Sequence, residues 1–473
     1  MPQQPLHAIQ RLFAALRDDR RGSVFAIGAA AIMVFVGIAG IATDSTLGFL
    51  VKSRMSKALD AAGLAAGRSA LSSDVTTEAR AFFDANFRVD YLDAEIIDFA
   101  VTPDANVEYI TLTASASVPT RFMRVFGIND LAVNARTVVH RQTRGMELVL
   151  VMDNTGSMRS GGMMGAMKAA AQDLVNILYS GHETLPNFWV GLVPFVASVN
   201  IGVQHSDGLA PTDRLFDTPS PFAPTTWKGC VEARTAPHDQ SDATPMTEPF
   251  RSYLYPADVD NIWPPLDETN EAENNGHGPN LGCGPAITPL AAERSTISAA
   301  ITDMQPWHRG GTAANLGLVW GWRALSPLWR GLWGDIALPL DYNTPLMDKV
   351  VVVLTDGQNQ FFDWRDHTPN SGIGPGGSDY TAYGRLADFG FATLTAGRAQ
   401  IDTRFSNICT QIKANGIILY TITFGTTPDT TTQNLYRTCA SSPANYFHAP
   451  SNAVLSTTFR TIGERLSNLR IAQ

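Results

Sequence analysis

Positive charge is scarce in this sequence, and the basic residues do not gather into any long run. The 35 lysines and arginines are outnumbered by 44 aspartates and glutamates, which leaves a formal net charge of −9. Because nucleic-acid binding relies on a basic surface, this balance argues against a nucleic-acid partner. The composition is that of a globular protein, and 473 residues are too many for one core, so we expect two or more domains.

Several enzyme motifs are absent as well. The sequence contains no HExxH zinc-binding motif, no phosphate-binding P-loop and no Ser-His-Asp order. We therefore predict no catalytic residues and expect a protein that is not an enzyme.

Residues 24–43 contain no charged side chain. They follow a polar segment with four arginines, and Asp44 comes directly after them. At about 1.5 Å per residue, this run just crosses the hydrocarbon core of a bilayer. We predict a retained transmembrane helix with its N-terminus in the cytoplasm and the bulk of the chain outside. The alternatives are a cleaved signal peptide, with residues 40–42 as a small-residue cleavage site, and a buried core helix.

A helical pattern with an apolar stripe continues over residues 45–71, which predicts a stalk behind the membrane helix. A short helix is expected at 76–87, with Asp74 or Thr76 as its N-cap. Alternating apolar and polar residues then predict half-exposed strands at 96–101, 109–118 and 131–141, with a helix at 119–126 that begins at Pro119. We interpret this as a small α+β module for spacing or partner contact.

Cysteine is rare, and its four copies are an even number but too few for a disulfide scaffold. Cys230 and Cys283 could form a zinc site with His238 and His277, but neither the C-x₂-C nor the H-x₃₋₅-H spacing is present. Outside the cytoplasm a disulfide is the commoner fate. We therefore predict two disulfides, Cys230–Cys283 and Cys409–Cys439.

The chain is organised around residues 148–158 (LVLVMDNTGSM). The apolar run at its start predicts a buried parallel strand. That strand ends on Asp153, and hydroxyls follow at Thr155 and Ser157. A carboxylate and two hydroxyls at alternate positions are hard oxygen ligands, which suit Mg²⁺ or Mn²⁺.

Two later stretches offer further ligands. Thr312 lies on a Gly-rich turn before a helical pattern, and a second apolar run, residues 349–355, ends on Asp356. In a doubly wound sheet, ligands bind beyond the carboxyl ends of the strands, so both aspartates would lie at one crevice. The alternative for either aspartate alone is that it caps a helix or a turn.

This set of residues resembles the metal-ion-dependent adhesion site of von Willebrand factor A (VWA) domains. The pattern of that site is D-x-S-x-S followed by a distant Thr and a distant Asp, and it falls on Asp153, Thr155, Ser157, Thr312 and Asp356. Thr155 in place of the first Ser is the single departure, and it keeps the hydroxyl. The resemblance implies a doubly wound, Rossmann-like α/β domain whose metal ion takes an Asp or Glu carboxylate from a protein partner.

Periodicity predicts the other elements of this domain. Two segments rich in Pro, Gly and polar residues are expected as long loop insertions, at about 198–290 and 358–395. The expected strands are 188–196, 417–424 and an edge strand at 445–448. The expected helices are 163–179, 291–304, 313–325 with a core Trp stripe, 398–415, 435–439 and 451–469.

The N-terminal region resembles tight-adherence (Flp) pilus assembly proteins of the TadE/TadG type. The resemblance rests on Arg20-Arg21-Gly22, the Gly/Ala-rich span, Asp44 and residues 58–65 (ALDAAGLA). It implies a single-pass, pilin-like protein of the cell inner membrane whose C-terminal domain is periplasmic or extracellular. The expected division is a cytoplasmic segment 1–22, a membrane helix and stalk 23–72, an α+β module 73–144 and a VWA domain 145–473.

Two other functions use the same site residues. A surface adhesin for host or matrix ligands would differ only in location. A metal-dependent hydrolase would need a general base, and His308 is the candidate nearest to Thr312.

Overall fold

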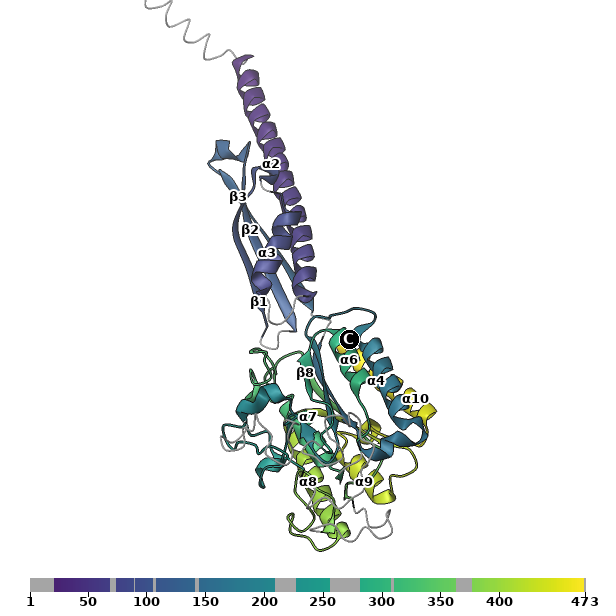
Figure 1. Cartoon of the computed structure of the whole chain (residues 1–473). Coiled ribbons are helices and arrows are strands. Elements are labelled where there is room, and N and C mark those ends of the chain that lie inside the picture. The colour runs from purple at the N-terminus through teal and green to yellow at the C-terminus, as the bar shows by residue number, and fades with distance from the viewer. Residues whose placement is uncertain are drawn as a thin grey trace, which may run out of the picture. The chain divides into compact units, whose positions relative to one another are not determined.

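The computed structural model describes residues 21–68, 74–88, 90–104, 108–140, 144–208, 227–255, 281–307, 310–362 and 377–471. The chain divides into two compact units, residues 1–141 and 142–473, whose elements are labelled in Figure 1. Most of the predicted cytoplasmic segment 1–22 lies outside the described residues.

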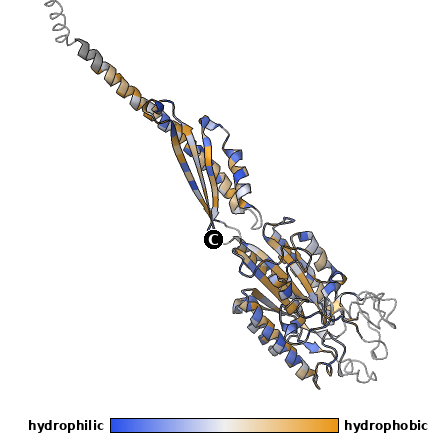
Figure 2. Cartoon of the chain, turned by 90° about the vertical axis from the view of Figure 1, so that its left-hand side faces the viewer, coloured by the Kyte–Doolittle hydropathy of each residue, from blue (hydrophilic) through white to orange (hydrophobic). Residues whose placement is uncertain are grey.

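The first unit is built on one long helix, α2 (Arg21–Arg68), so the membrane helix and the stalk predicted from the sequence are continuous. Within the described part of the chain, this is the one helix that is long and apolar enough to cross a membrane. Its N-terminal half carries exposed Ile32, Phe35 and Val36, and Figure 2 colours these turns as mainly hydrophobic. Exposed apolar side chains of this kind suit a lipid environment.

The C-terminal half of α2 packs on a three-stranded antiparallel sheet, β1 (Glu95–Pro103), β2 (Tyr109–Pro119) and β3 (Asp130–His140). Every second residue of β2 is buried, as the alternating pattern predicts. α3 (Val75–Asn86) completes this core, and the Asp74 carboxylate accepts the N–H groups of Thr76 and Thr77 at 3.0 and 3.2 Å, which makes Asp74 the N-cap. A short 3₁₀ turn, η1 (Tyr91–Asp93), precedes β1.

The helix predicted for residues 119–126 is wrong. Pro119 is the last residue of β2 and pairs with Asp130, and only a four-residue 3₁₀ turn, η2 (Met123–Phe126), follows it. The prediction took Pro119 as a helix start, but a proline is equally compatible with a strand end, where its missing N–H breaks no ladder bond. Gly127 then ends the turn with φ +83°, a conformation that glycine adopts without strain.

The second unit has a six-stranded sheet in the order β13-β12-β10-β4-β5-β8. All neighbouring pairs are parallel except β5 and β8, which run antiparallel at one edge. The bounds are β4 (Gly145–Asp153), β5 (Phe188–Phe195), β8 (Thr288–Ala291), β10 (Met347–Thr355), β12 (Ile418–Phe424) and β13 (Tyr446–Ala449).

Helices cover both faces of this sheet because its central strands are apolar on both sides. Leu148 and Leu150 of β4 share a core with one group of helices, whereas Val149 and Val151 share a core with the other. The first group is α4 (Met163–Tyr179), α6 (Arg294–Asp303) and α10 (Asn452–Ile471), and the second is α7 (Ala314–Arg323), α8 (Leu394–Ala414) and α9 (Thr430–Cys439). The predicted doubly wound α/β architecture is confirmed.

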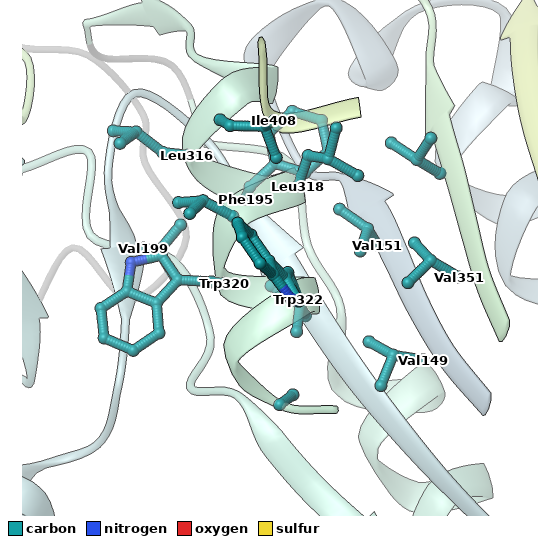
Figure 3. Close-up of a cluster of buried hydrophobic side chains, with 14 of the residues drawn as sticks. Val149, Val151, Phe195, Val199, Leu316, Leu318, Trp320, Trp322, Val351 and Ile408 are labelled. Carbon is teal, nitrogen blue, oxygen red and sulfur yellow. The ribbon is translucent and has the colours of Figure 1, made fainter. Parts of the chain in front are cut away.

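Helix α7 lies especially close to the sheet. A Cβ atom on Gly317 would come within 2.5 Å of the Phe195 ring, and one on Gly321 within 2.5 Å of a Val151 methyl group. Figure 3 shows Trp322 of this helix between Phe195 and Val151, with Trp320 beside Val199. The Trp stripe therefore belongs to the core, as predicted, and the two glycines let α7 approach the strands that end at the candidate site.

The first insertion contains more regular structure than its composition suggested. It includes β6 (Val199–Asn200), η4 (Val203–Gly208), β7 (Cys230–Val231) and η6 (His238–Gln240), and it ends in β8, an edge strand of the main sheet. The remaining short elements are η3 (Gly156–Gly162), β9 (Gly311–Thr312), η8 (Pro327–Trp329), β11 (Gln360–Phe361) and η11 (Pro443–Asn445). α9 begins five residues before the prediction, because Asp429 caps it by accepting the Thr432 N–H at 2.7 Å.

Both predicted disulfides are present, Cys230–Cys283 and Cys409–Cys439. Cys230 and Cys283 are fully buried with Tyr253 and Tyr255, so their sulfur atoms are not available to a zinc ion. His277 lies outside the described residues.

Replacing Cys409 and Cys439 together by alanine should lower the free energy of unfolding of the second unit by about 3–4 kcal/mol, because the bond closes a loop in the unfolded chain. Cys230 and Cys283 are farther apart in the sequence, by 53 residues against 30, so loss of their disulfide should lower the free energy of unfolding slightly more. Denaturant unfolding of the oxidised chain measures both. Unchanged unfolding midpoints in the two variants would contradict this account.

Candidate metal site

Asp153 occupies the end of the central strand β4 and is completely buried. Its Oδ1 accepts hydrogen bonds from the Thr155 N–H at 2.8 Å and the Thr155 hydroxyl at 2.6 Å. Its Oδ2 accepts the Thr355 hydroxyl, from the end of the neighbouring strand β10, at 2.7 Å. The carboxylate is therefore held by groups from both central strands.

Ser157 connects this arrangement to the second predicted aspartate. The hydroxyl oxygens of Thr155 and Ser157 lie 3.1 Å apart, and Ser157 donates to Asp356 Oδ1 at 2.7 Å. Asp356 directly follows β10, which is paired in parallel with β4 up to Leu354 and Met152. Four of the five predicted residues thus lie together at the carboxyl ends of two adjacent strands, as two hydroxyl–carboxylate hydrogen bonds whose hydroxyl oxygens are 3.1 Å apart.

Thr312, the fifth predicted residue, is buried on β9. β9 pairs with β11, where Thr312 lies opposite Gln360, four residues after Asp356. Gly311 has φ +99°, and a Cβ there would come within 2.3 Å of the Gln360 carbonyl oxygen, so the glycine is needed for the two strands to meet. Among the hydrogen bonds of the described residues, none links the Thr312 hydroxyl to either aspartate.

Backbone hydrogen bonds tie the segments on both sides of Thr312 to the residues that follow β4 and β5. The Trp307 N–H donates to the Asn154 carbonyl at 2.7 Å, and the Ala313 N–H donates to the Val196 carbonyl at 3.1 Å. These backbone bonds bring the three stretches predicted from the sequence to one edge of the sheet.

The two carboxylates share a site that disfavours negative charge. Burial, together with the charge of Asp153, raises the pKa of Asp356 to about 8. Burial also raises the pKa of Asp153, against the opposing effect of the hydrogen bonds from Thr155 and Thr355. A divalent cation would reverse both shifts by supplying the missing positive charge.

One oxygen of the site has no hydrogen-bond partner. Asp356 Oδ2 is buried and unpaired, and the neighbouring Asn154 Oδ1 is also buried without a partner. Buried polar atoms are normally paired, so an orphaned carboxylate oxygen beside two hydroxyls indicates a position for a ligand. The donor set of carboxylates and hydroxyls fits Mg²⁺ or Mn²⁺.

Two residues at the site were missed in the sequence. The apolar run predicts Thr355 as the last residue of a strand, and its hydroxyl directly before Asp356 is the signal in the sequence that indicates a role at the site. Tyr436 comes from α9 and is buried, and burial together with the charge of Asp153 raises its pKa. No spacing rule connects Tyr436 to the aspartates. His308, the candidate general base, lies outside the described residues.

No protein-family model matches the sequence, and no curated protein matches it either. Among solved structures, the pilus adhesin SpaC from Lactobacillus rhamnosus GG matches at 13% identity and a TM-score of 0.38, covering 80% of this chain and 35% of the adhesin. The chain therefore spans about a third of the length of that protein.

Two further solved structures match as well. The von Willebrand factor domain of the type V pilus tip protein Mfa5 from Porphyromonas gingivalis matches at 11% identity and a TM-score of 0.36, covering 70% of this chain and 97% of that domain. Proximal thread matrix protein 1 from the mussel byssus, with a zinc-occupied MIDAS motif, matches at 13% identity and a TM-score of 0.32. The match covers 69% of this chain and 46% of the mussel protein.

The raised pKa of Asp356 predicts a pH dependence of metal binding. The folded pKa of about 8 exceeds the usual value of 3.8, so this group favours folding at low pH, and that contribution is lost as the pH rises through 8. A metal ion requires the carboxylate, so binding must displace the proton below pH 8. Calorimetry at pH 6, 7 and 8 should show Mg²⁺ affinity rising about tenfold per pH unit for each displaced proton.

The matched control for this measurement is Glu464→Gln, which removes one exposed carboxylate of α10 twelve residues after the start of that helix. This variant should keep the full pH dependence, whereas Asp356→Asn should lose metal binding at every pH. An Mg²⁺ affinity that does not change between pH 6 and 8 would show that Asp356 is not a ligand.

Proposed function

We propose that this chain is a membrane-anchored protein of pilus assembly, related to the TadG type, and that its second unit binds an acidic group of a protein partner through a bound Mg²⁺ or Mn²⁺ ion. The observation that carries the proposal is that the Thr155 and Ser157 hydroxyls, 3.1 Å apart, donate to Asp153 and Asp356, while one buried Asp356 oxygen is left unpaired. This geometry supports the VWA-like site that the sequence pattern implies.

In this proposal, Thr155, Ser157, Thr312 and the two aspartates hold the ion directly or through water. The bound ion supplies a Lewis-acidic position that attracts an anion. Hydroxyl ligands leave more positive charge on the ion than carboxylates would, which favours an incoming Asp or Glu of the partner. Ser157 is exposed while Asp153, Thr155, Thr312 and Asp356 are buried, so the partner approaches from the Ser157 side.

The anchor supports a location in the cell envelope. Helix α2 offers the length and hydropathy of one membrane span, and the arginine-rich segment before it favours a cytoplasmic N-terminus. Two disulfides in the second unit suit an oxidising compartment outside the cytoplasm. Together these features support a single-pass protein of the inner membrane with its second unit in the periplasm or beyond.

Binding is favoured over catalysis by the composition of the site. Among the described residues, no third histidine, cysteine or carboxylate joins Asp153 and Asp356 in a metal-binding group. The Thr155 and Ser157 hydroxyls donate to carboxylates, which orient these hydroxyls as ligands rather than activate them as nucleophiles.

Asp153→Ala and Asp356→Ala should each lower Mg²⁺ affinity at least about 100-fold, above the ~10–100-fold typical for loss of an outer-shell partner. Thr355→Val, which removes the hydroxyl donated to Asp153 Oδ2, should fall within that smaller range. Thr155→Ser keeps the hydroxyl and should bind almost as the parent does. Calorimetry on the full chain in nanodiscs measures all four variants, with circular dichroism to check the fold.

Partner binding is tested separately by capture from an envelope extract, with and without EDTA. Capture should need the divalent ion and should disappear in both aspartate variants. Full metal affinity in both variants would rule out the assigned site. Hydrolysis of a phosphate ester that is lost with His308→Ala would instead establish the enzyme alternative.

A further inference from the structure

The turn between β2 and β3 exposes an unusual amount of apolar surface. Phe122, Val125, Phe126 and Ile128 are 45%, 80%, 59% and 42% exposed, although they lie within seven residues of one another. We refer to residues 121–128 as the apolar turn. Clustered large apolar side chains on a short turn generally mark an interaction surface.

The apolar turn lies against the charge-free part of α2. The Phe126 ring is 3.2 Å from the position that a Cβ on Gly37 would take, and the Phe122 Cβ is 2.6 Å from the corresponding position on Gly40. Both glycines are buried by this contact, whereas Val36, Ile38 and Ile41 beside them are exposed. The missing side chains of the two glycines allow the turn to approach the helix closely.

Asp44 holds the apolar turn against the part of α2 that contains Gly37 and Gly40. Its carboxylate, only 1% exposed, accepts the backbone N–H groups of Arg121, Phe122 and Met123 at 3.0, 2.9 and 2.7 Å. At the base of the turn, the Thr120 hydroxyl donates to the Ile128 carbonyl at 2.5 Å. The exposed apolar side chains are therefore held in place by polar bonds at both ends of the turn.

The positions of the charged residues limit which part of α2 can lie in the hydrocarbon core of a bilayer. Arg21 and Asp44 bracket 22 uncharged residues. At about 1.5 Å per residue these residues span roughly 33 Å, only slightly more than the ~30 Å hydrocarbon core. Gly40 and Gly37 precede Asp44 by four and seven residues. Both glycines, about 6 and 10 Å before Asp44 along the helix, therefore fall within the hydrocarbon.

We propose that the apolar turn inserts into the phospholipid bilayer beside α2 and forms a second membrane contact of the first unit. This inference depends on the proposal that α2 spans the membrane. Because the turn packs against Gly37 and Gly40, it must enter the lipid wherever those residues do. The exposed Arg124 side chain is long enough to keep its charge near the lipid phosphates while its neighbours are in the hydrocarbon.

Such an insertion would restrict the orientation of the first unit. A single helix can rotate about its axis and tilt in the bilayer, and neighbouring contacts and interfacial anchors normally set both angles. A rigid apolar turn on one side of α2 gives the helix a fixed rotation, and it places the adjoining ends of β2 and β3 at the membrane surface.

The test uses single cysteine variants of the full chain, reconstituted in vesicles of phosphatidylcholine and phosphatidylglycerol. The four native cysteines are held in disulfides, so an introduced cysteine can be labelled selectively with an environment-sensitive fluorophore. The test sites are Val125→Cys and Ile128→Cys in the apolar turn. Val34→Cys, exposed on the membrane helix, and Val138→Cys, exposed on β3, are the matched lipid and water controls.

Labels at residues 125 and 128 should show blue-shifted emission and lose intensity when brominated lipids replace the normal ones, as the label at residue 34 does. The label at residue 138 should show neither effect. Water-like emission at 125 and 128, with residue 34 quenched, would overturn the insertion while leaving the membrane span intact. Blue-shifted emission without quenching would assign the turn to a protein contact, such as a second copy of the chain. No quenching at residue 34 would remove the membrane span and the insertion together.

Discussion

The second unit depends on two carboxylates that are buried side by side at the ends of its central strands. Asp153 is the last residue of β4 and Asp356 directly follows β10, and the parallel register of these strands brings both residues to the same end of the sheet. Their burial raises both pKa values, so the folded chain retains groups that resist ionisation. A hydrophobic pair in their place would avoid this cost, because buried charges are expensive unless a partner compensates them. This unfavourable burial of two carboxylates is consistent with a ligand that supplies positive charge.

The rest of the unit can be understood as the support for this pair. β4 and β10 are apolar on both faces, which requires a helical layer on each side and leaves only the strand ends for polar groups. Gly317 and Gly321 bring α7 close to these strands, while Gly311 lets β9 meet β11. Hydroxyls from Thr155, Ser157 and Thr355 then orient carboxylate oxygens from both strands. Rigid strands with short polar loops produce a preorganised site.

Elements that depend on local sequence pattern could be predicted from the sequence. Elements and site residues whose position depends on a tertiary contact could not. The strands of the doubly wound sheet and α4 follow from apolar runs and helical periodicity, and Asp153, Thr155, Ser157 and Asp356 follow from their positions after those runs. β8 was missed because four residues carry no periodic signal and become a strand only by pairing with β5. The turn after Pro119 is organised by Asp44, 77 residues away from Arg121, which no local rule detects. Tyr436 reaches the site through the packing of α9, so spacing in the sequence could not identify it.

Asp44 marks the point where the continuous helix α2 changes from exposed apolar side chains to side chains packed against the sheet. Before it, apolar side chains are exposed around the helix, and after it, buried residues such as Val51, Met55 and Leu59 form a stripe against the sheet. A charged residue at such a boundary would normally require water. Here three backbone N–H groups replace the water and hold the pKa of Asp44 below its usual value, although burial alone would raise it. One of these bonds satisfies the Met123 N–H, the first donor of the η2 turn, so one carboxylate both ends the apolar span and positions the apolar turn beside it.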